Sequence, residues 1–297
     1  MAIGSQQIPL PDVAARLGAY QVLAPLAKGG MCDVYLGSHL LTGERVAIKV
    51  LDPDLVNEAP IVARLLAERE VSIRVQHPGL VDVRAADRSA QGTIYVVMEY
   101  LDGENLNALA ERGPMVHGAI AAIGAQIAEA LDALHGAGIV HGDVKPDNVV
   151  VLYEQGIAGW PRIKVIDFGV SRFLDRLEVD DGSIAGTPSY MPPEQWRGEP
   201  GPKSDVYSLG CLLYEIATGT LPFSGPLPKL MLAHVHEMPK RPSSHRPDLP
   251  PELDRLIMRA LAKDPAMRPG MRELRDCLTA VSVFMPGEAA ELLEATG

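Results

Sequence analysis

The chain has 297 residues and a formal net charge of −11, and 47% of its residues are apolar. This length is sufficient for one large domain or two small lobes without disulfides to hold them. The acidic balance argues against a nucleic acid or an acidic membrane surface as the main partner.

The three cysteines, Cys32, Cys211 and Cys277, lie far apart and show no metal-type spacing. They predict reduced thiols and a cytoplasmic location. The amino terminus lacks the basic start and apolar core of a signal peptide, and no apolar run reaches the ~18 residues of a membrane span.

The first hundred residues predict a small sheet with one helix, after a loose lead-in over residues 1–19. Apolar residues at helical spacing predict the helix over Pro60–Gln76. Runs of β-type residues bounded by turn signals predict strands at Tyr20–Leu23, Val34–Leu36, Val46–Leu51, Leu80–Val83 and Ile94–Met98.

A polar break at Leu101–Glu104 is expected to act as a hinge, and the pattern after it becomes helical. Ser204 is a candidate N-cap and Gly219 a candidate stop for a helix that is apolar on nearly every side. The Pro-rich stretch Met238–Pro251 predicts a surface loop. Helices are expected at His117–His135, Asp205–Thr218, Glu252–Leu261 and Met271–Val283.

The segment Leu26–Tyr35 places two adjacent glycines, Gly29 and Gly30, between two predicted strands. Glycines let a backbone approach phosphate oxygens and direct N–H groups at them. The same pattern is also typical of an ordinary hairpin turn, which is the alternative interpretation.

Lys49 lies on an apolar strand, on the same face as Ala47 and Leu51. A buried ammonium needs a carboxylate partner, and Glu68 and Glu70 on the following helix both qualify by helical periodicity. The alternative is an edge-strand lysine whose ammonium extends to water.

The stretch His141–Asn148 combines a carboxylate, an ammonium and an amide within one short turn. We expect Asp143 to accept the proton of an attacking hydroxyl and Lys145 to neutralise a moving phosphoryl group. Asn148 and Asp167, the latter at the end of an apolar run, are expected to hold magnesium ions. The combination predicts phosphoryl transfer; the alternative is a polar loop without catalytic function.

Taken in order, these motifs resemble those of serine/threonine protein kinases, in particular the compact eukaryotic-like kinases of bacteria. The resemblance covers about Tyr20 to Phe284. Its marks are the glycine loop, Val46–Lys49, His77-Pro78, His141-x-Asp143, Asp167-Phe168-Gly169, Gly186–Met191, Pro193-Glu194, Asp205–Gly210 and Arg268-Pro269.

The resemblance implies an α+β, bilobal protein kinase-like fold with a small β-rich N-lobe and a larger, mainly helical C-lobe. The kinase domain is expected over residues 20–285, with the N-lobe at 20–99, the hinge at 99–103 and the C-lobe at 104–285. A tail of residues 286–297 is expected to follow.

The resemblance also implies ATP between the lobes, magnesium as the metal with manganese as a substitute, and serine or threonine of a protein as the acceptor. It selects Glu68 as the partner of Lys49 and pairs Glu194 with Arg268. The implied catalytic residues are Lys49, Glu68, Asp143, Lys145, Asn148, Asp167 and Thr187. The implied nucleotide-binding residues are Leu26, Ala27, Lys28, Gly29, Gly30, Met31, Cys32, Asp33, Val34, Ala47, Lys49, Met98, Glu99, Leu101 and Val150.

The chain departs from the family pattern at several positions. Ala27 and Cys32 replace two glycines of the loop, and Gly142 replaces the arginine that in the family meets a phosphate on the activation segment. We therefore expect activity that depends little on phosphorylation of that segment, of which Ser183 is a member. A stretch near Tyr153–Arg162 looks inserted.

Two other functions are consistent with parts of the pattern. Gly142 before Asp143 also occurs in small-molecule phosphotransferases of the aminoglycoside and choline type, but those enzymes lack the Gly186–Glu194 segment. The second alternative is a pseudokinase scaffold. A scaffold has no need to retain all four of Lys49, Asp143, Asn148 and Asp167, and their joint presence argues against it.

Overall fold

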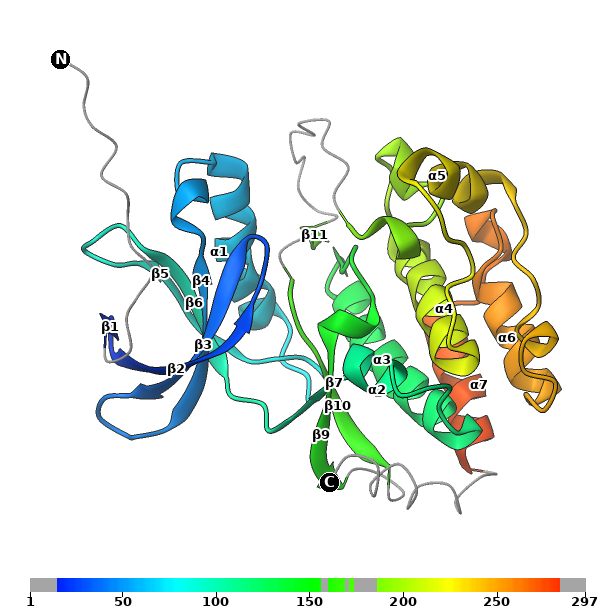
Figure 1. Ribbon diagram of the computed structural model, residues 1–297, viewed down its shortest axis with the longest axis horizontal. Coiled ribbons are helices and arrows are strands. Elements are labelled where there is room, and N and C mark those ends of the chain that lie inside the picture. The colour runs from blue at the N-terminus through cyan, green and yellow to red at the C-terminus, as the bar shows by residue number, and fades with distance from the viewer. Residues whose placement is uncertain (1–14, 156–159, 169–170, 174–185, 284–297) are drawn as a thin grey trace. The chain divides into compact units, whose positions relative to one another are not determined.

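The computed structural model describes residues 15–155, 160–168, 171–173 and 186–283 (Figure 1). Contacts between Cα atoms divide the chain into two compact units. A β-rich unit comprises residues up to 76, residues 81–101 and residues 167–169. A mainly helical unit comprises residues 77–80, residues 102–166 and the chain from residue 170 onward.

The β-rich unit contains a six-stranded antiparallel sheet in the order β1-β2-β3-β4-β6-β5. The strands are β1 (Arg16–Leu17), β2 (Tyr20–Lys28), β3 (Cys32–His39), β4 (Arg45–Leu51), β5 (Val83–Arg88) and β6 (Ile94–Glu99). The short β1 belongs to the stretch that was expected to be a loose lead-in.

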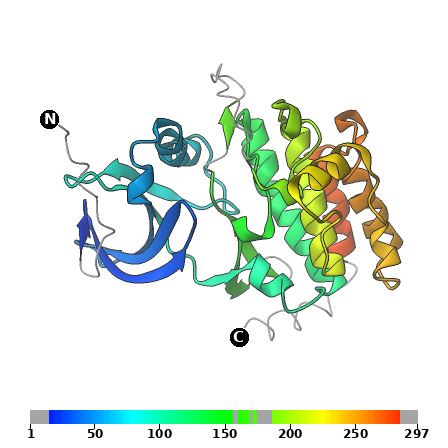
Figure 2. The same ribbon diagram turned by 45° about the horizontal axis from the view of Figure 1, so that its top comes forward.

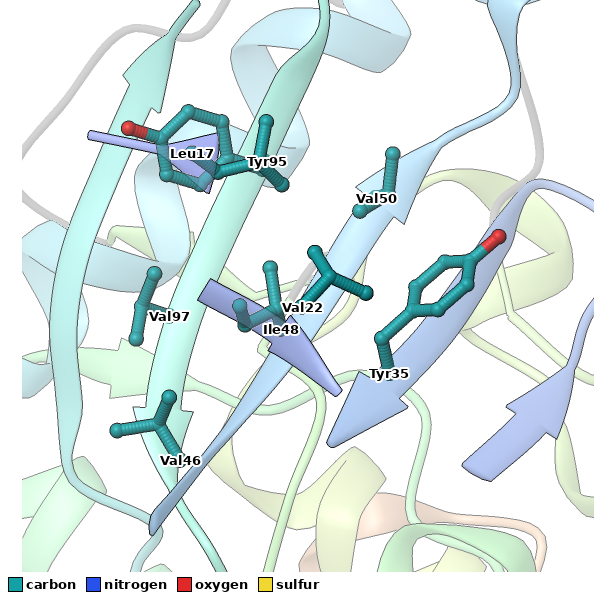
Figure 3. Packing of buried hydrophobic residues seen from close by; sticks show 8 residues of the cluster. All are labelled: Leu17, Val22, Tyr35, Val46, Ile48, Val50, Tyr95 and Val97. Carbon is teal, nitrogen blue, oxygen red and sulfur yellow. The ribbon is translucent and has the colours of Figure 1, made fainter. Parts of the chain in front are cut away.

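One face of this sheet forms a closed apolar cluster, shown in Figure 3. Alternation along β4 directs Val46, Ile48 and Val50 to this face, and Ala47, Lys49 and Leu51 to the other. The cluster consists of Leu17, Val22, Tyr35, Val46, Ile48, Val50, Tyr95 and Val97. Burial of these side chains fixes the register of the central strands and so the position of Lys49.

The predicted helix of this unit is α1 (Ala59–Arg74), which packs against β5 and β6. It buries Leu65, Glu68 and Val71 on one stripe. The expected strand at Leu80–Val83 is wrong at its start, because β5 begins only at Val83. Leu80 instead forms an isolated parallel bridge with Val165 in the helical unit.

The helical unit is built around α3 and α4, whose buried residues are almost entirely apolar. Helix α7 packs along α3, and α6 packs against α4 and α7 (Figures 1 and 2). The helices are α2 (Leu106–Ala110), α3 (His117–Gly136), α4 (Pro202–Thr218), α5 (Leu227–His236), α6 (Pro251–Ala260) and α7 (Met271–Val283). The prediction of a buried central helix before Gly219 is confirmed.

Two small sheets complete the helical unit. One has the order β10-β9-β7 and the other pairs β11 with β8. The strands are β7 (Gly103–Asn105), β8 (Ile139–Val140), β9 (Val149–Gln155), β10 (Pro161–Val165) and β11 (Arg172–Phe173). The polar break expected as a hinge therefore runs into strand β7. Residues 156–159 of the stretch that looks inserted lie outside the described residues.

Several predicted boundaries in the helical unit are wrong. Ser204 is the third residue of α4, and Gly201 is its N-cap; the Ser204 hydroxyl accepts a hydrogen bond from the Gly201 amide. The Pro-rich stretch contains a short 3₁₀ turn at Pro242–Ser244, and its last residue begins α6. Helices α2 and α5 were not predicted, because both are short, with five and ten residues. Among the described residues, none of the helices combines the length and apolarity needed to cross a bilayer.

Candidate active site

The loop after β8 brings the predicted catalytic residues of the helical unit together. Strand β8 ends at Val140, and the loop closes in a 3₁₀ turn, η2 (Pro146–Asn148), that leads into β9. The amide of Ile166, just after β10, donates to the carbonyl of Asn148. The loop thus lies between β8, which pairs with β11, and β9, which pairs with β10. Its side chains are therefore held on a rigid support.

Asp143 is held by three other side chains of the loop and its surroundings. The amide and the hydroxyl of Thr187 both donate to Oδ1 of Asp143, at 2.8 and 2.7 Å. The Lys145 ammonium lies 2.8 Å from Oδ2 and also donates to the Thr187 hydroxyl at 2.7 Å. Asn148 Nδ2 donates to Oδ2 at 3.2 Å. The carboxylate therefore has one orientation before any substrate arrives.

Asn148 is buried, and its amide is oriented by the loop. Nδ2 also donates to the backbone carbonyl of Asp143 at 2.8 Å. Among the described residues, none donates a hydrogen bond to Oδ1 of Asn148. An amide oxygen with open lone pairs is a suitable ligand for a hard cation such as Mg²⁺.

Asp205, on α4, anchors the start of the loop, and the prediction did not assign it this position. Its carboxylate accepts the amides of His141 and Gly142, each at 2.9 Å, and lies 2.7 Å from His135 Nε2. Burial alone would raise the pKa of the Asp205 carboxyl, but the hydrogen bond and charge of His135, with His141 and Gly142, hold it below its usual value. In the sequence, the signal for this anchoring role is an aspartate in the first turn of a helix that is otherwise apolar on nearly every side. Such a carboxylate is expected to be buried and therefore to need hydrogen-bond partners.

Gly142 lies in the backbone conformation that favours glycine, with φ at +80°. Its carbonyl accepts a hydrogen bond from Gln195 Nε2 at 2.8 Å. The glycine that replaces the family's arginine is thus fixed from both sides, by Asp205 and by Gln195.

In the β-rich unit, Lys49 pairs with two carboxylates. Its ammonium lies 2.7 Å from Glu68 Oε1 and 3.0 Å from Asp167 Oδ1. Burial by itself would lower the pKa of Lys49, but the charges of Glu68 and Asp167 raise it above its usual value. Of the two glutamates that periodicity left open, Glu68 is the partner, while Glu70 pairs with Arg74 on the same helix.

Asp167 lies in an unusual backbone conformation. Its φ of +66° is the only positive value among the described residues that are not glycine. Such a conformation is strained for an aspartate and persists only where the surroundings impose it, often at functional sites. Gly169, which ends the Asp-Phe-Gly motif, lies outside the described residues.

The predicted phosphate loop is the hairpin turn between β2 and β3. Lys28 pairs with Asp33 and Ala27 with Val34 across the hairpin. A Cβ on Gly29 would lie 2.5 Å from the carbonyl oxygen of Cys32, so the turn requires glycine there. The segment is thus a hairpin turn, as the alternative interpretation held. A hairpin turn of this kind can still direct its backbone N–H groups at phosphate oxygens. Burial raises the pKa of the Cys32 thiol to about 11, so this cysteine is a thiol at neutral pH.

The residues expected around the adenine ring lie on neighbouring strands. Ala47 of β4 pairs with Met98 of β6, and Val34 of β3 pairs with Lys49. The Leu101 N–H, just after β6, donates to no acceptor in the described part of the chain. An unpaired backbone donor of this kind is available to a heterocyclic base. Val150 lies on β9 in the helical unit.

Glu194 and Arg268 form a buried bidentate ion pair in the helical unit, as the resemblance implied. The two guanidinium nitrogens lie 2.6 and 2.9 Å from the two carboxylate oxygens, and Ser204 donates to the same carboxylate at 2.7 Å. Burial would raise the pKa of Glu194, but Arg268 holds it below its usual value. The pair ties the segment before α4 to the turn before α7.

Comparison with known proteins places these features in a family. Residues 20–277 match the family model described as "Protein kinase domain". The chain is 39% identical to the serine/threonine-protein kinase Pkn1 of Myxococcus xanthus over 87% of its length and 37% of the relative. It is 37% identical to the serine/threonine-protein kinase PknB of Mycobacterium leprae over 92% of its length and 44% of that protein.

Among solved structures, the kinase domain of PknI from Mycobacterium tuberculosis matches with a TM-score of 0.72 and 29% identity. The match covers 92% of this chain and 100% of that domain. The prediction of an α+β protein kinase-like fold, with a β-rich and a mainly helical part, is confirmed. The chain spans less than half the length of the curated relatives reported above.

Proposed function

The chain belongs to the protein kinase family, with bacterial serine/threonine kinases among its relatives, and we propose that it transfers the γ-phosphoryl group of ATP to serine or threonine of proteins. The observation that carries this proposal is the set of contacts on Asp143. Thr187, Lys145 and Asn148 hold one carboxylate ready to orient a hydroxyl and accept its proton.

The residues present fit a nucleotide with a divalent ion. Lys49 is a fixed cation, the Leu101 N–H is an open donor, and Asn148 Oδ1 is an open oxygen ligand. In the described part of the chain, no three or more His, Cys, Asp or Glu side chains form a metal cluster of their own. The ion would therefore be held by Asn148 and Asp167 together with phosphate oxygens, as is usual for Mg²⁺.

In this proposal ATP supplies the phosphoryl group and magnesium, or manganese in its place, neutralises the charge on the phosphates. Lys49 binds phosphate oxygens while Glu68 orients its ammonium. Lys145 neutralises charge on the transferred group, and Thr187 keeps Asp143 directed at the acceptor hydroxyl. The glycine turn after β2 directs backbone N–H groups to the phosphates.

We further propose that Gly142 makes activity largely independent of phosphorylation in the activation segment. No arginine stands before Asp143 to bind a phosphate, and Asp205 and Gln195 already fix the loop at this point. Cytoplasmic location remains a prediction from the sequence.

The test is transfer of radiolabel from γ-labelled ATP with magnesium to the protein itself and to a set of dephosphorylated proteins, followed by phosphoamino acid analysis. We expect label on serine or threonine. Asp143→Asn should reduce turnover by about 10² to 10⁴-fold, the usual loss for a general base. The exposed Asp276→Asn on α7 is the matched control and should have no effect.

Nucleotide binding without transfer to any polypeptide would contradict the proposal and favour a pseudokinase scaffold. Transfer to an aminoglycoside or to choline, with none to polypeptides, would favour a small-molecule phosphotransferase instead.

A further inference from the structure

The side-chain amide of Gln195 lies where the catalytic loop meets the segment that carries Thr187. Its Nε2 donates to the carbonyl of Gly142 at 2.8 Å. A Cβ added to Gly186 would lie 2.6 Å from the same Nε2 and 3.1 Å from the Gly142 carbonyl oxygen. The glutamine amide and the backbones of the two glycines are therefore packed directly against one another, with no room for a side chain at residue 186.

Each of these two glycines directly precedes a residue of the candidate active site. Gly142 is followed by Asp143, and Gly186 is followed by Thr187. Thr187 donates both its amide and its hydroxyl to the Asp143 carboxylate. Gln195 thus links the two backbone segments whose next residues form this contact.

The peptide group that joins Gly142 to Asp143 is held at both of its polar atoms. Gln195 donates to its carbonyl oxygen, and its N–H donates to Nδ1 of His141 at 3.2 Å. Because a peptide group is planar, two hydrogen bonds at its two ends restrain its rotation. The rotation of this plane sets the direction in which the Asp143 side chain leaves the backbone. Loss of the Gln195 bond would remove one of these two restraints.

Gln195 is itself held on a fixed support. It begins the 3₁₀ turn η5 (Gln195–Arg197), and it is only 6% exposed. Its backbone N–H donates to the carbonyl of Pro192 at 3.1 Å. The preceding residue, Glu194, forms the buried ion pair with Arg268. A side chain on such a base is pre-organised to hold the loop in one position.

From these contacts we propose that Gln195 is a positioning residue for phosphoryl transfer. Its amide holds the Gly142 peptide group against the backbone before Thr187, so that Asp143 and Thr187 meet in the geometry that orients the acceptor hydroxyl. This restraint is a neutral side chain that is present at all times and needs no phosphate on the activation segment. The proposal rests on the proposed kinase function, because Gln195 acts only through Asp143 and Thr187.

The first test compares variants of Gln195 by steady-state kinetics. Gln195→Met keeps nearly the same side-chain length but donates no hydrogen bond, and Gln195→Glu places a carboxylate against the Gly142 carbonyl. We expect kcat to fall about tenfold in Gln195→Met and further in Gln195→Glu, because a buried carbonyl loses its donor. KM for ATP should stay within about twofold of the parent, since the contact restrains Asp143 and not the nucleotide residues.

Gln126→Met is the matched control. The side-chain amide of Gln126, on α3, also binds backbone: it donates to the carbonyl of Pro161 at 3.0 Å and accepts from the amide of Ile163 at 3.3 Å. This variant should lower the midpoint of urea unfolding, as Gln195→Met should, but should leave kcat within about twofold of the parent. Equal losses of kcat in the two variants would show that Gln195 has a structural role alone, and the proposal would be wrong.

Hydrogen exchange gives a readout that does not require catalysis. The Thr187 N–H is bonded to Asp143, and selective isotope labelling of threonine makes it observable by NMR. We expect this N–H to exchange at least about tenfold faster in Gln195→Met than in the parent, and at the parental rate in Gln126→Met. Unchanged exchange in Gln195→Met would overturn the proposal.

A double-mutant cycle tests whether Gln195 and Gly186 act together. Gly186→Ala adds a Cβ at the place of the Gln195 amide and strains the backbone, which has a φ of +122° at this residue. The backbone strain is the same in both backgrounds, but Gln195→Ala removes the clash. Gly186→Ala should therefore lower kcat at least about threefold less in the Gln195→Ala background than in the parent. Equal losses in the two backgrounds would contradict the proposal.

The outcomes separate this proposal from the proposed function. If the parent transfers no phosphate to any polypeptide, both fail. If the parent is active and the Gln195 variants match it in kcat, the kinase function stands and only the positioning role fails, whatever the exchange of the Thr187 N–H.

Discussion

Thr187 donates its amide and its hydroxyl to the same oxygen of Asp143, at 2.8 and 2.7 Å. The hydroxyl also accepts from Lys145, so it lies between the carboxylate and the ammonium. One threonine thus contacts both the carboxylate and the ammonium. The arrangement can be tested residue by residue.

Thr187→Val should lower kcat by about 10- to 100-fold, because Oδ1 of Asp143 then keeps only the backbone amide of residue 187 and the Lys145 ammonium keeps only Oδ2 of Asp143. KM for ATP should change little, since Thr187 is placed against Asp143 and not against the nucleotide residues. Thr187→Ser keeps the hydroxyl and should restore most of kcat. Equal kcat for the valine and serine variants would show that the hydroxyl does not position Asp143.

Glu68→Gln should lower the free energy of unfolding by about 3 kcal/mol, because it leaves the buried Lys49 ammonium with Asp167 as its remaining carboxylate. KM for ATP should rise at the same time. Urea unfolding and steady-state kinetics measure the two effects. Glu70→Gln, two residues away on α1, weakens the partly exposed pair with Arg74 and should change stability by less than about 1 kcal/mol. Equal effects of the two variants would refute the assignment of Glu68.

Glu194→Gln should destabilise the protein by about 3 to 5 kcal/mol, since it leaves the fully buried Arg268 guanidinium without its counter-charge. The comparison is Glu273→Gln, which breaks the exposed pair of Glu273 with Arg259 and should have an effect below about 1 kcal/mol. Midpoints of urea unfolding with unchanged m-values would give both numbers.

Because of His234, the free energy of unfolding should decrease as the pH is lowered. Burial, with the charge of Lys263, lowers the pKa of His234 to about 4, from about 6.5 in the unfolded chain. Between these values the unfolded state binds the proton and the folded state does not, so the folded state loses stability as the pH falls through this window. From pH 7.5 to 5.0 the loss amounts to about 2 kcal/mol.

The variant His234→Gln keeps a polar group beside the Tyr207 hydroxyl, which lies 3.0 Å from Nδ1 of the histidine. Its unfolding free energy should be less sensitive to pH over the same interval by about that amount. An unchanged difference between pH 7.5 and 5.0 would show that His234 is not the titrating group.

Ser183→Ala and Ser183→Glu should both leave basal activity within about twofold of the parent, because Gly142 offers no guanidinium to a phosphate. Ser183 lies outside the described residues, so this prediction rests on Gly142 and its fixed environment. Loss of activity in the alanine variant, with rescue by glutamate, would show that segment phosphorylation still controls the enzyme.

The sequence predicted the strands and the helices with different success. Alternation placed Lys49 on β4 correctly, since period-two patterning is local and its apolar face must be buried. Helix α5 escaped prediction, because ten residues are too few for a pattern to stand out from its surroundings. The start of α4 was misplaced because Ser204 caps well by type, yet its hydroxyl is used by Gly201 and Glu194.

By itself, the sequence determined the chemical groups and their order: the carboxylates, the lysines, the amide and the glycine turn, each in a local motif. Helical periodicity alone did not decide between Glu68 and Glu70, a choice that the family resemblance made correctly, and nothing in the sequence showed that Asp205 and Gln195 hold the loop at Gly142. These contacts join residues between 19 and 63 positions apart. Only folding settles them, because a buried charge takes whichever partner the packed helices and strands bring within reach.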